Sequence, residues 1–453
     1  MTAPFAAAAP GTKGELRRVL SLVAVVALVT GNMLGTSIYT LPASLAETTG
    51  PLGLAAWAIT GAGYYAVAVI YARLGSRYPR SGGPYVYVRR AFGDFAGFLT
   101  MWSYWVSAVI GNAAIVTAVV GYAVGLSTVL QASVAAQFGL AQGLLWALCW
   151  LNIRGVRQSA LLQTFVMFAT IVPLVVIALL SLPSFDTANL TPFAPHGYGS
   201  LAAGATLVVW AYSGVESATV PAEEVVAPER TIGLGTMIGY GLATAVYLLV
   251  AFVAIGTVSS AELAQSARPL ALVAERTLGS PGALIMAFAA IVGGLGTLNG
   301  WTLLAGRIPL AAAQDGVFFP SVARIHPTYG TPYRAIVVGT AVASVTCLLY
   351  FSTTLLGVFK FVVLLAVFTT LLPHVLVAAA ELLLVRRASE GFSHHERKRT
   401  QVVGLTAFGF LLFTIYGAGA EVVLWGLLVV LAGIPLYVWL KTGPDGERAG
   451  TAA

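Results

Sequence analysis

The chain has 453 residues, of which 58% are hydrophobic and only 9% are charged. A soluble domain carries roughly a quarter charged residues, so this composition excludes a soluble enzyme and indicates a membrane protein. The formal net charge of +7 comes from basic residues scattered between apolar runs, which argues against nucleic acid as a partner. Both cysteines, Cys149 and Cys347, fall inside apolar runs, so neither a disulfide framework nor a thiolate metal site is expected.

Twelve apolar segments follow one another along the chain. Each is about as long as a membrane-crossing helix, which needs about 20 residues for a hydrocarbon core of roughly 30 Å. The segments are 19–45, 52–72, 95–126, 133–153, 160–182, 200–226, 232–257, 282–312, 335–352, 355–385, 402–418 and 421–440. We therefore predict an all-α integral membrane protein with twelve transmembrane helices, an even number that places both termini on one side.

The distribution of basic residues predicts which side that is. Among the 24 Lys and Arg residues, only Arg268 and Arg276 fall in a loop opposite the termini, and Lys360 falls within the tenth span. The others, with Arg307 counted among them, lie near the termini or in loops on the same side. The positive-inside rule then places both termini in the cytoplasm.

Both ends of the chain are rich in small and charged residues, so we expect residues 1–18 and 442–453 to be disordered and cytoplasmic. Residues 1–18 contain no short apolar region followed by a cleavage site, which argues against a removable targeting signal. Residues 386–441 are expected to form a cytoplasmic loop and the last two helices.

Two spans contain glycine-rich interruptions, TGNMLGTS at 30–37 and WAYSGVES at 210–217. Backbone amides in hydrocarbon must be paired internally, so a broken helix is tolerated only where it lines a protein cavity. A matched pair of broken helices is typical of the midplane binding site of secondary transporters. The alternative, that the glycines only allow close helix packing, is weakened by the symmetric positions of the two interruptions.

Spans one and six are equivalent if residues 19–385 form two five-helix repeats, 19–182 and 200–385. Because five is odd, the second repeat enters the membrane from the opposite side, and the repeats are inverted. The free NH groups of a half-helix suit a carboxylate, whereas the free carbonyls suit an ammonium group.

Few ionisable residues lie deep in the predicted spans. A carboxylate in the middle of a span costs at least about 2.5 kcal/mol, so Glu216 should face the bundle interior, either in a transport role or bonded to a neighbouring helix. Glu381 lies close enough to a span end to be solvated, and Lys360 can snorkel. His374 is either a packing residue or a proton relay. Trp301 is either an interfacial anchor or an aromatic face for a cation.

Several motifs resemble a known family. YPRSGGPYVY at 78–87 resembles the loop signature of the amino-acid, polyamine and organocation transporter superfamily. GNMLGTS at 31–37, YWVSAVIGN at 104–112, WAYSGVES at 210–217 and NGWTLLAG at 299–306 are similar to the bacterial arginine/agmatine antiporters in particular. The resemblance runs from about residue 19 to 440. It implies a LeuT-like five-plus-five inverted-repeat fold with broken helices 1 and 6 and two extra C-terminal helices, commonly a homodimer.

The resemblance also implies roles for individual residues, without any catalytic residue, cofactor or metal. The substrate carboxylate maps to Gly35, Thr36 and Ser37, and the α-ammonium to carbonyls of Met33, Trp210 and Ser213. Ser107, Ala108 and Asn112 match the part of the third span that meets the distal guanidinium, and Trp301 matches an indole that stacks on the substrate. Trp210 also matches a gating aromatic, and an inner gate maps to Tyr104, Glu216 and His374.

Three departures from the antiporter pattern stand out. The first break reads Gly-Thr-Ser rather than Gly-Ser-Gly, Ser107 and Ala108 replace a different small pair, and His374 replaces a tyrosine. Glu216 and His374 are therefore hypothesised to share a proton and to couple transport to pH. Residues 158–182 contain no Lys or Arg, so the lysine by which some superfamily members mimic sodium is missing, which favours exchange.

We therefore expect a transporter of the bacterial inner (plasma) membrane, not an enzyme. Its partners are the lipid bilayer and a small amino acid or amine, and an antiporter exchanging an arginine-like cation for its decarboxylated amine or another amino acid is favoured. The alternative is a proton-coupled or uniport transporter of neutral amino acids or polyamines. A membrane enzyme would need a metal or nucleophile cluster, which the histidines at 196, 326, 374, 394 and 395 do not supply. A nutrient sensor would need a longer tail beyond Lys441.

Overall fold

The computed structural model describes residues 16–350, 356–387 and 394–442, and in these ranges the regular structure is helical apart from one bridge between Leu20 and Val225. Most of the two ends predicted to be disordered, and the Lys360 side chain, lie outside the described residues. The α-helices are α1 (Leu22–Met33), α2 (Thr36–Thr49), α3 (Gly53–Arg77), α4 (Pro84–Phe92), α5 (Asp94–Val124), α6 (Thr128–Ala132), α7 (Val134–Arg154), α8 (Val156–Ser181), α9 (Ser200–Tyr212), α10 (Pro228–Thr257), α11 (Ser260–Gln265), α12 (Pro269–Gln314), α13 (Tyr333–Tyr350), α14 (Leu356–Arg387), α15 (His394–Ala418), α16 (Ala420–Leu431) and α17 (Gly433–Thr442).

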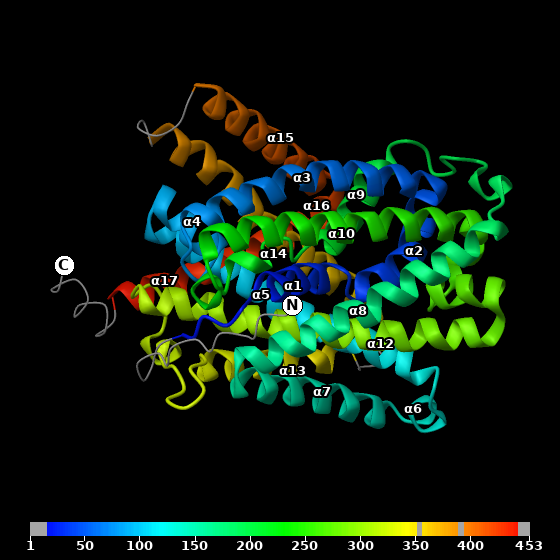
Figure 1. The fold of residues 1–453 in the computed structure, drawn as a ribbon, viewed down its shortest axis with the longest axis horizontal. Coiled ribbons are helices and arrows are strands. Elements are labelled where there is room, and N and C mark those ends of the chain that lie inside the picture. Colours follow the sequence, from blue (N-terminus) through cyan, green and yellow to red (C-terminus); the bar gives the residue numbers. More distant parts are fainter. Residues whose placement is uncertain (1–15, 351–355, 388–393, 443–453) are drawn as a thin grey trace, which may run out of the picture.

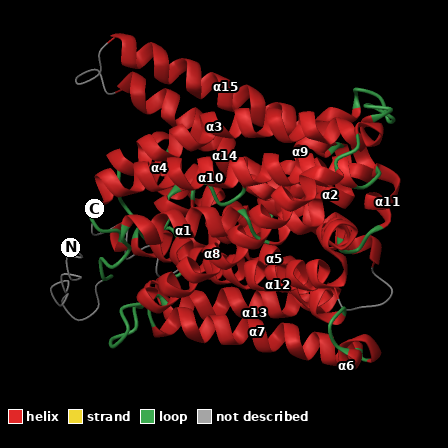
Figure 2. Cartoon of the chain, turned by 45° about the vertical axis from the view of Figure 1, so that its right-hand side comes forward, coloured by secondary structure: helices red, strands yellow, loops and turns green. Residues whose placement is uncertain are grey.

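The long helices run alongside one another to form a bundle, with α15 and α7 at opposite edges (Figure 1). Figure 2 shows the same arrangement from a second direction, with loops gathered at the two ends of the bundle. In the interior, α12 packs against α5 and α8, while α10 packs against α1 and α3. The backbone turns within α12 at Gly279, whose φ of 68° is one that glycine adopts without strain.

Among the described residues, nine helical stretches are long and apolar enough to cross a membrane, whereas the sequence predicts twelve spans. The first stretch, Leu22–Arg77, contains predicted spans one and two because α1, α2 and α3 follow closely. The sixth predicted span falls short because α9 ends after 13 residues. The ninth corresponds to a shorter apolar helix, Tyr333–Leu349.

The outer helices present apolar side chains outward. On α8, Leu161, Phe165, Phe168 and Val172 are each more than half exposed. Their spacing of four, three and four residues places them on one helix face. An apolar stripe of this kind on the outside of a bundle suits contact with hydrocarbon, so the chain is a multi-pass membrane protein.

Candidate functional site

The first break in the helices lies between α1 and α2. The N–H of Leu34 closes the last turn of α1 on the carbonyl of Thr30, and α2 begins at Thr36. The gap falls inside the segment 30–37, where the glycines predict an interruption. Because the first N–H groups of a helix have no partner within that helix, the start of α2 offers donors to an anionic group such as a carboxylate.

Gly35 allows α12 to approach this break closely. A Cβ atom at Gly35 would lie 2.1 Å from Thr297 Oγ1, which is much shorter than a van der Waals contact. Thr297 Oγ1 in turn donates to the carbonyl of Gly31 at 2.8 Å. A glycine is therefore required sterically at position 35, and α12 is fixed directly against the broken backbone.

The second break follows Tyr212, the last residue of α9. Gly214 has a φ of 111°, and a Cβ atom there would lie 2.9 Å from the Asn32 Cβ. Asn32 Nδ2 donates to Ser217 Oγ at 2.8 Å. The chain then makes only short 3₁₀ turns, at Ser217–Thr219 and Ala222–Glu224, before α10. The two breaks therefore lie against each other in the interior of the bundle.

A cavity of about 20 Å³ lies between the two breaks. It is lined by residues of α1, α2, α5, α9, α12 and α14 and of the breaks themselves, namely Asn32, Gly35, Thr36, Ser37, Ser107, Gly111, Ile115, Trp210, Ser213, Thr297, Trp301 and Thr370. This volume is enough for about one water molecule. An amino acid therefore enters only if the surrounding helices move apart.

Most of the predicted substrate-binding residues line this cavity, and the exceptions are Met33, Ala108 and Asn112. Ala108 and Asn112 are buried in α5 beside the lining residues Ser107 and Gly111. The Met33 carbonyl accepts hydrogen bonds from the hydroxyls of Tyr247 and Ser37. Since a carbonyl has two lone pairs, an ammonium group would have to displace one of these donors.

Five lining residues were not predicted, namely Asn32, Gly111, Ile115, Thr297 and Thr370. Helix periodicity offers a signal for some of them. Ser107, Gly111 and Ile115 are four residues apart and so share one face of α5, and Thr370 lies one turn before His374 on α14. Thr297 carries no such signal, because a threonine in an apolar helix usually satisfies its own backbone.

Two buried amide oxygens at this site, Asn32 Oδ1 and Asn112 Oδ1, accept no hydrogen bond from the part of the chain that is described. Leaving a buried acceptor unpaired costs roughly 1–3 kcal/mol, which a donor on a ligand would recover. Ammonium and guanidinium groups consist entirely of donors. Trp301, which lines the cavity, adds an aromatic face that attracts a cation.

A buried polar cluster lies beside the cavity and contains the three residues predicted to form an inner gate. Glu216 accepts a hydrogen bond from the Tyr104 hydroxyl, and His374 Nε2 lies 3.8 Å from Glu216 Oε2. The Tyr71 hydroxyl, which was not predicted, lies 2.8 Å from His374 Nδ1. The Tyr104 ring faces Trp301 with 5.9 Å between ring centroids. The cluster therefore touches the cavity wall through an aromatic contact.

Two ion pairs, one of them buried on both sides, correct the sequence interpretation. Arg307 Nε and Nη2 donate to Glu224 at 2.5 and 3.0 Å, and both side chains are fully buried. The assignment of Arg307 to a cytoplasmic loop is wrong, because Arg307 lies within α12, which continues to Gln314, and its side chain is buried. Glu381 is only 1% exposed and lies 2.9 Å from Arg73 Nε, so the prediction that it is solvated is also wrong. In both pairs the partner comes from a distant segment.

The loop signature at 78–87 and α4 are held against the end of α12. Asp315 pairs with Arg80, and its Oδ2 lies 2.8 Å from Arg89 Nη1 and accepts from the Tyr85 hydroxyl at 3.0 Å. Burial, followed by the negative charge of Asp315, raises the pKa of Tyr85 above its usual value. The phenol therefore stays protonated and can donate. The motif therefore ties α4 and the loop before it to the C-terminal end of α12.

A bundle of apolar helices with two breaks facing one internal cavity defines a multi-pass membrane protein with a small-molecule site in its interior. In the three described ranges, no group of three or more His, Cys, Asp or Glu side chains is placed to hold a metal ion. The chain belongs to the amino acid permease family, which it matches over residues 20–440. Members of this family are membrane transporters rather than enzymes.

Named relatives share most of their length with the chain. It is 30% identical to the arginine/ornithine antiporter of Pseudomonas aeruginosa over 94% of this chain and 92% of the relative. It is 28% identical to the putrescine transporter PotE of Escherichia coli, covering 92% of this chain and 95% of that protein. It is 26% identical to the arginine/agmatine antiporter of Chlamydia abortus, covering 95% of this chain and 91% of that protein. These matches confirm the resemblance found in the sequence motifs.

Proposed function

We propose that this protein is an antiporter that exchanges a cationic, arginine-like amino acid for its decarboxylated amine or for another amino acid by alternating access. The observation that carries the proposal is the meeting of the two breaks at one cavity. That cavity has the start of α2 on one wall and, on another, Asn32, whose Oδ1 accepts no hydrogen bond among the described residues. The first suits a carboxylate and the second a cation. The names of the antiporter relatives support the same substrate class.

Within this proposal the substrate carboxylate binds at Gly35, Thr36 and Ser37. The α-ammonium binds carbonyls of Met33, Trp210 and Ser213, with Met33 exchanging the Tyr247 hydroxyl for the ligand. The distal group reaches Asn112 beside Ser107 and Ala108, and its aliphatic part stacks on Trp301. Closure of the inner side is assigned to Tyr104, Glu216 and His374, with Trp210 as the gating aromatic over the site.

The architecture proposed with this function has twelve spans. Residues 19–182 and 200–385 are two inverted five-helix repeats, and α15 to α17 provide the two extra spans. Both termini face the cytoplasm of a bacterial cell, and two copies form a homodimer. Single cysteines placed at each end of the bundle test the orientation. A membrane-impermeant thiol reagent added outside intact cells should not label the end that carries the arginines.

Proteoliposomes loaded with a single unlabelled compound test the exchange directly. Uptake of labelled arginine should be fast into vesicles that contain the true exchange partner, which is sought among arginine, agmatine, ornithine and lysine. Uptake into empty vesicles should be slow. Equally fast uptake into empty vesicles would exclude obligatory exchange. A variant with Asn112 replaced by Leu serves as a matched comparison, because it removes an acceptor that has no donor among the described residues and adds no charge.

The second candidate is a proton-coupled or uniport transporter of neutral amino acids or polyamines. The relative named as a putrescine transporter favours the polyamine version. Putrescine has no carboxylate, so its transport would make the N–H groups at the start of α2 dispensable. Labelled putrescine entering empty vesicles under a proton gradient would favour this candidate over exchange.

A further inference from the structure

The imidazole of His374 on α14 has a polar neighbour beside each of its two nitrogens. The Tyr71 hydroxyl, which comes from α3, lies 2.8 Å from Nδ1. Glu216 Oε2, which comes from the second break, lies 3.8 Å from Nε2. All three side chains are buried, so neither nitrogen faces bulk water. The position of the ring proton is therefore decided by these two neighbours.

The Tyr71 hydroxyl decides the Nδ1 side. In the described ranges its hydrogen-bond partner is His374 Nδ1 and no other atom. A phenol can donate or accept, and a neutral imidazole has one N–H and one bare nitrogen. If Nδ1 carried the proton, Tyr71 would have to accept, and the buried phenol proton would be left without an acceptor, which is unfavourable. Donation by Tyr71 to a bare Nδ1 satisfies both groups.

The Glu216 carboxylate favours the same arrangement from the Nε2 side. Its Oε1 accepts from the Tyr104 hydroxyl, and its Oε2 accepts from the Gly214 N–H at 3.1 Å. Both oxygens therefore act as acceptors, as they do in an ionised carboxylate. A bare Nε2 would turn its lone pair toward this group, whereas an Nε2–H is attracted to it. A movement of about 1 Å would bring Nε2 to hydrogen-bond distance of Oε2.

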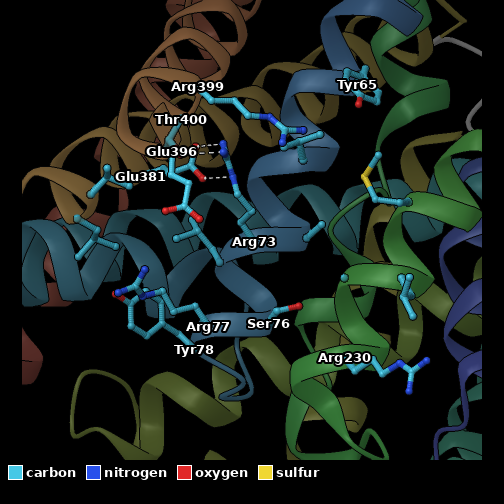
Figure 3. Close-up of a pocket in the computed structure, with 18 residues that line it drawn as sticks. Tyr65, Arg73, Ser76, Arg77, Tyr78, Arg230, Glu381, Glu396, Arg399 and Thr400 are labelled. Carbon is cyan, nitrogen blue, oxygen red and sulfur yellow. Dashed lines mark hydrogen bonds and ion pairs between the residues drawn. The ribbon is translucent and has the colours of Figure 1, made fainter. Parts of the chain in front are cut away.

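A second contact between the same two helices holds the ring beside the phenol. His374 and Glu381 are seven residues apart, so they share one face of α14. Arg73 on α3 donates to Glu381 Oε2 at 3.0 Å and to Thr400 Oγ1 at 2.8 Å. Figure 3 shows the Arg73 side chain extending toward Glu381 and Thr400. The spacing of α3 and α14 is therefore maintained without the Tyr71 hydroxyl.

We propose that Tyr71 is a positioning residue of the inner gate. Its hydroxyl donates to Nδ1 of His374 and thereby keeps the ring proton on Nε2, where it faces Glu216. Tyr71 does not line the central cavity, so it acts through His374 and not on the substrate. The role in the gate rests on the proposed transport function, whereas the tautomer of His374 does not.

The tautomer is tested by nitrogen NMR on the full-length protein, with histidine isotope-labelled at Nδ1 only. The spectrum is recorded at about pH 8, where a solvated imidazole is neutral. The resonance of His374 is the one that His374→Phe removes. In the wild type it should have the frequency of a bare nitrogen that accepts a hydrogen bond. In Tyr71→Phe it should move, because the donor is gone.

Tyr64→Phe is the matched control. The Tyr64 ring meets the His374 ring edge-on with 5.9 Å between centroids, against 5.5 Å for Tyr71. Its hydroxyl is also buried but has no hydrogen-bond partner among the described residues. Removal of this hydroxyl should leave the His374 resonance in place. A protonated Nδ1 in the wild type, or a His374 resonance that does not move in Tyr71→Phe, would overturn the proposal. If Tyr71→Phe does not fold, the wild-type resonance decides alone.

The role in the gate is measured separately, in proteoliposomes and by equilibrium binding. Tyr71→Phe should lower the maximal rate of arginine exchange roughly 2- to 10-fold, which is the factor that one neutral hydrogen bond contributes. The dissociation constant for arginine should keep its wild-type value, because Tyr71 lies outside the cavity lining. An unchanged maximal rate would remove Tyr71 from the gate. Absence of exchange by the wild-type protein would refute the proposed function and leave the tautomer standing.

Discussion

Removal of Arg307 is expected to destabilise the protein strongly. Glu224 accepts two hydrogen bonds from Arg307, at 2.5 and 3.0 Å, and neither side chain has any exposed surface. The variant Arg307→Met keeps most of the side-chain volume but leaves a buried carboxylate without its cation. Loss of one partner from a buried pair costs about 3–5 kcal/mol. Glu224→Gln should cost less, because an amide oxygen can still accept from the guanidinium.

Removal of both charges should restore much of the stability. In Arg307→Met, Glu224→Gln no unpaired charge remains, and exchange of a whole buried pair for uncharged groups is often close to neutral. We expect the double variant to be more stable than Arg307→Met by about 2–4 kcal/mol. The free energy of unfolding is measured by denaturant titration in mixed micelles, followed by tryptophan fluorescence.

The exposed pair Arg276–Glu262 provides the matched control, since its side chains are 54% and 38% exposed. Arg276→Met should cost no more than about 1 kcal/mol, because a solvated ion pair contributes little. If Arg307→Met is no more destabilising than this control, or if the double variant is as unstable as the sum of its single changes, the buried pair does not stabilise the fold as argued.

Three further predictions concern the central cavity. Trp301→Leu should weaken arginine binding by roughly 0.5–2 kcal/mol through loss of cation-π attraction, measured by equilibrium binding to purified protein; an unchanged dissociation constant would point to a different wall. Gly35→Ala should abolish transport because its Cβ would lie 2.1 Å from Thr297 Oγ1, and Gly35→Ala, Thr297→Ala should recover part of the rate. His374→Phe removes the imidazole whose Nε2 lies 3.8 Å from Glu216 Oε2, so it should flatten the dependence of transport on pH if the two side chains share a proton; a profile like that of the wild type would dismiss proton sharing with Glu216.

The helices and their breaks could be predicted from the sequence because both depend on local chemistry. Apolar runs of membrane length predict spans, and glycine clusters inside them predict interruptions, as at Gly35 and Gly214. The same pattern does not tell how many spans appear as uninterrupted helices in the structure. An interrupted span such as the sixth has too little helix on either side of its break to look like a crossing in the structure.

The pairs of charges could not be predicted, because they depend on which segments meet in three dimensions. Arg307 and Glu224 are 83 positions apart, and Arg73 and Glu381 are 308 apart. Each residue alone looked like part of a solvated helix end. A single sequence contains no information on such pairing, whereas Asn32 and Gly111 lie inside the motifs at 31–37 and 104–112 and were within reach.

The contacts around the central cavity differ in how easily they can be broken during transport. The Ser107–Thr370 and Tyr104–Glu216 hydrogen bonds contribute roughly 0.5–1.5 kcal/mol for the neutral pair and roughly 1.5–3 kcal/mol where the acceptor is charged. A substrate with a dissociation constant between 1 mM and 1 µM supplies about 4–8 kcal/mol. Separation of Arg307 from Glu224 would use most of that energy, unless water reached both charges. The backbone carbonyl of Glu224 also accepts from the N–H groups of residues 19 and 20, which adds to the closure there. The first opening of the cavity is therefore expected on the side away from this ion pair.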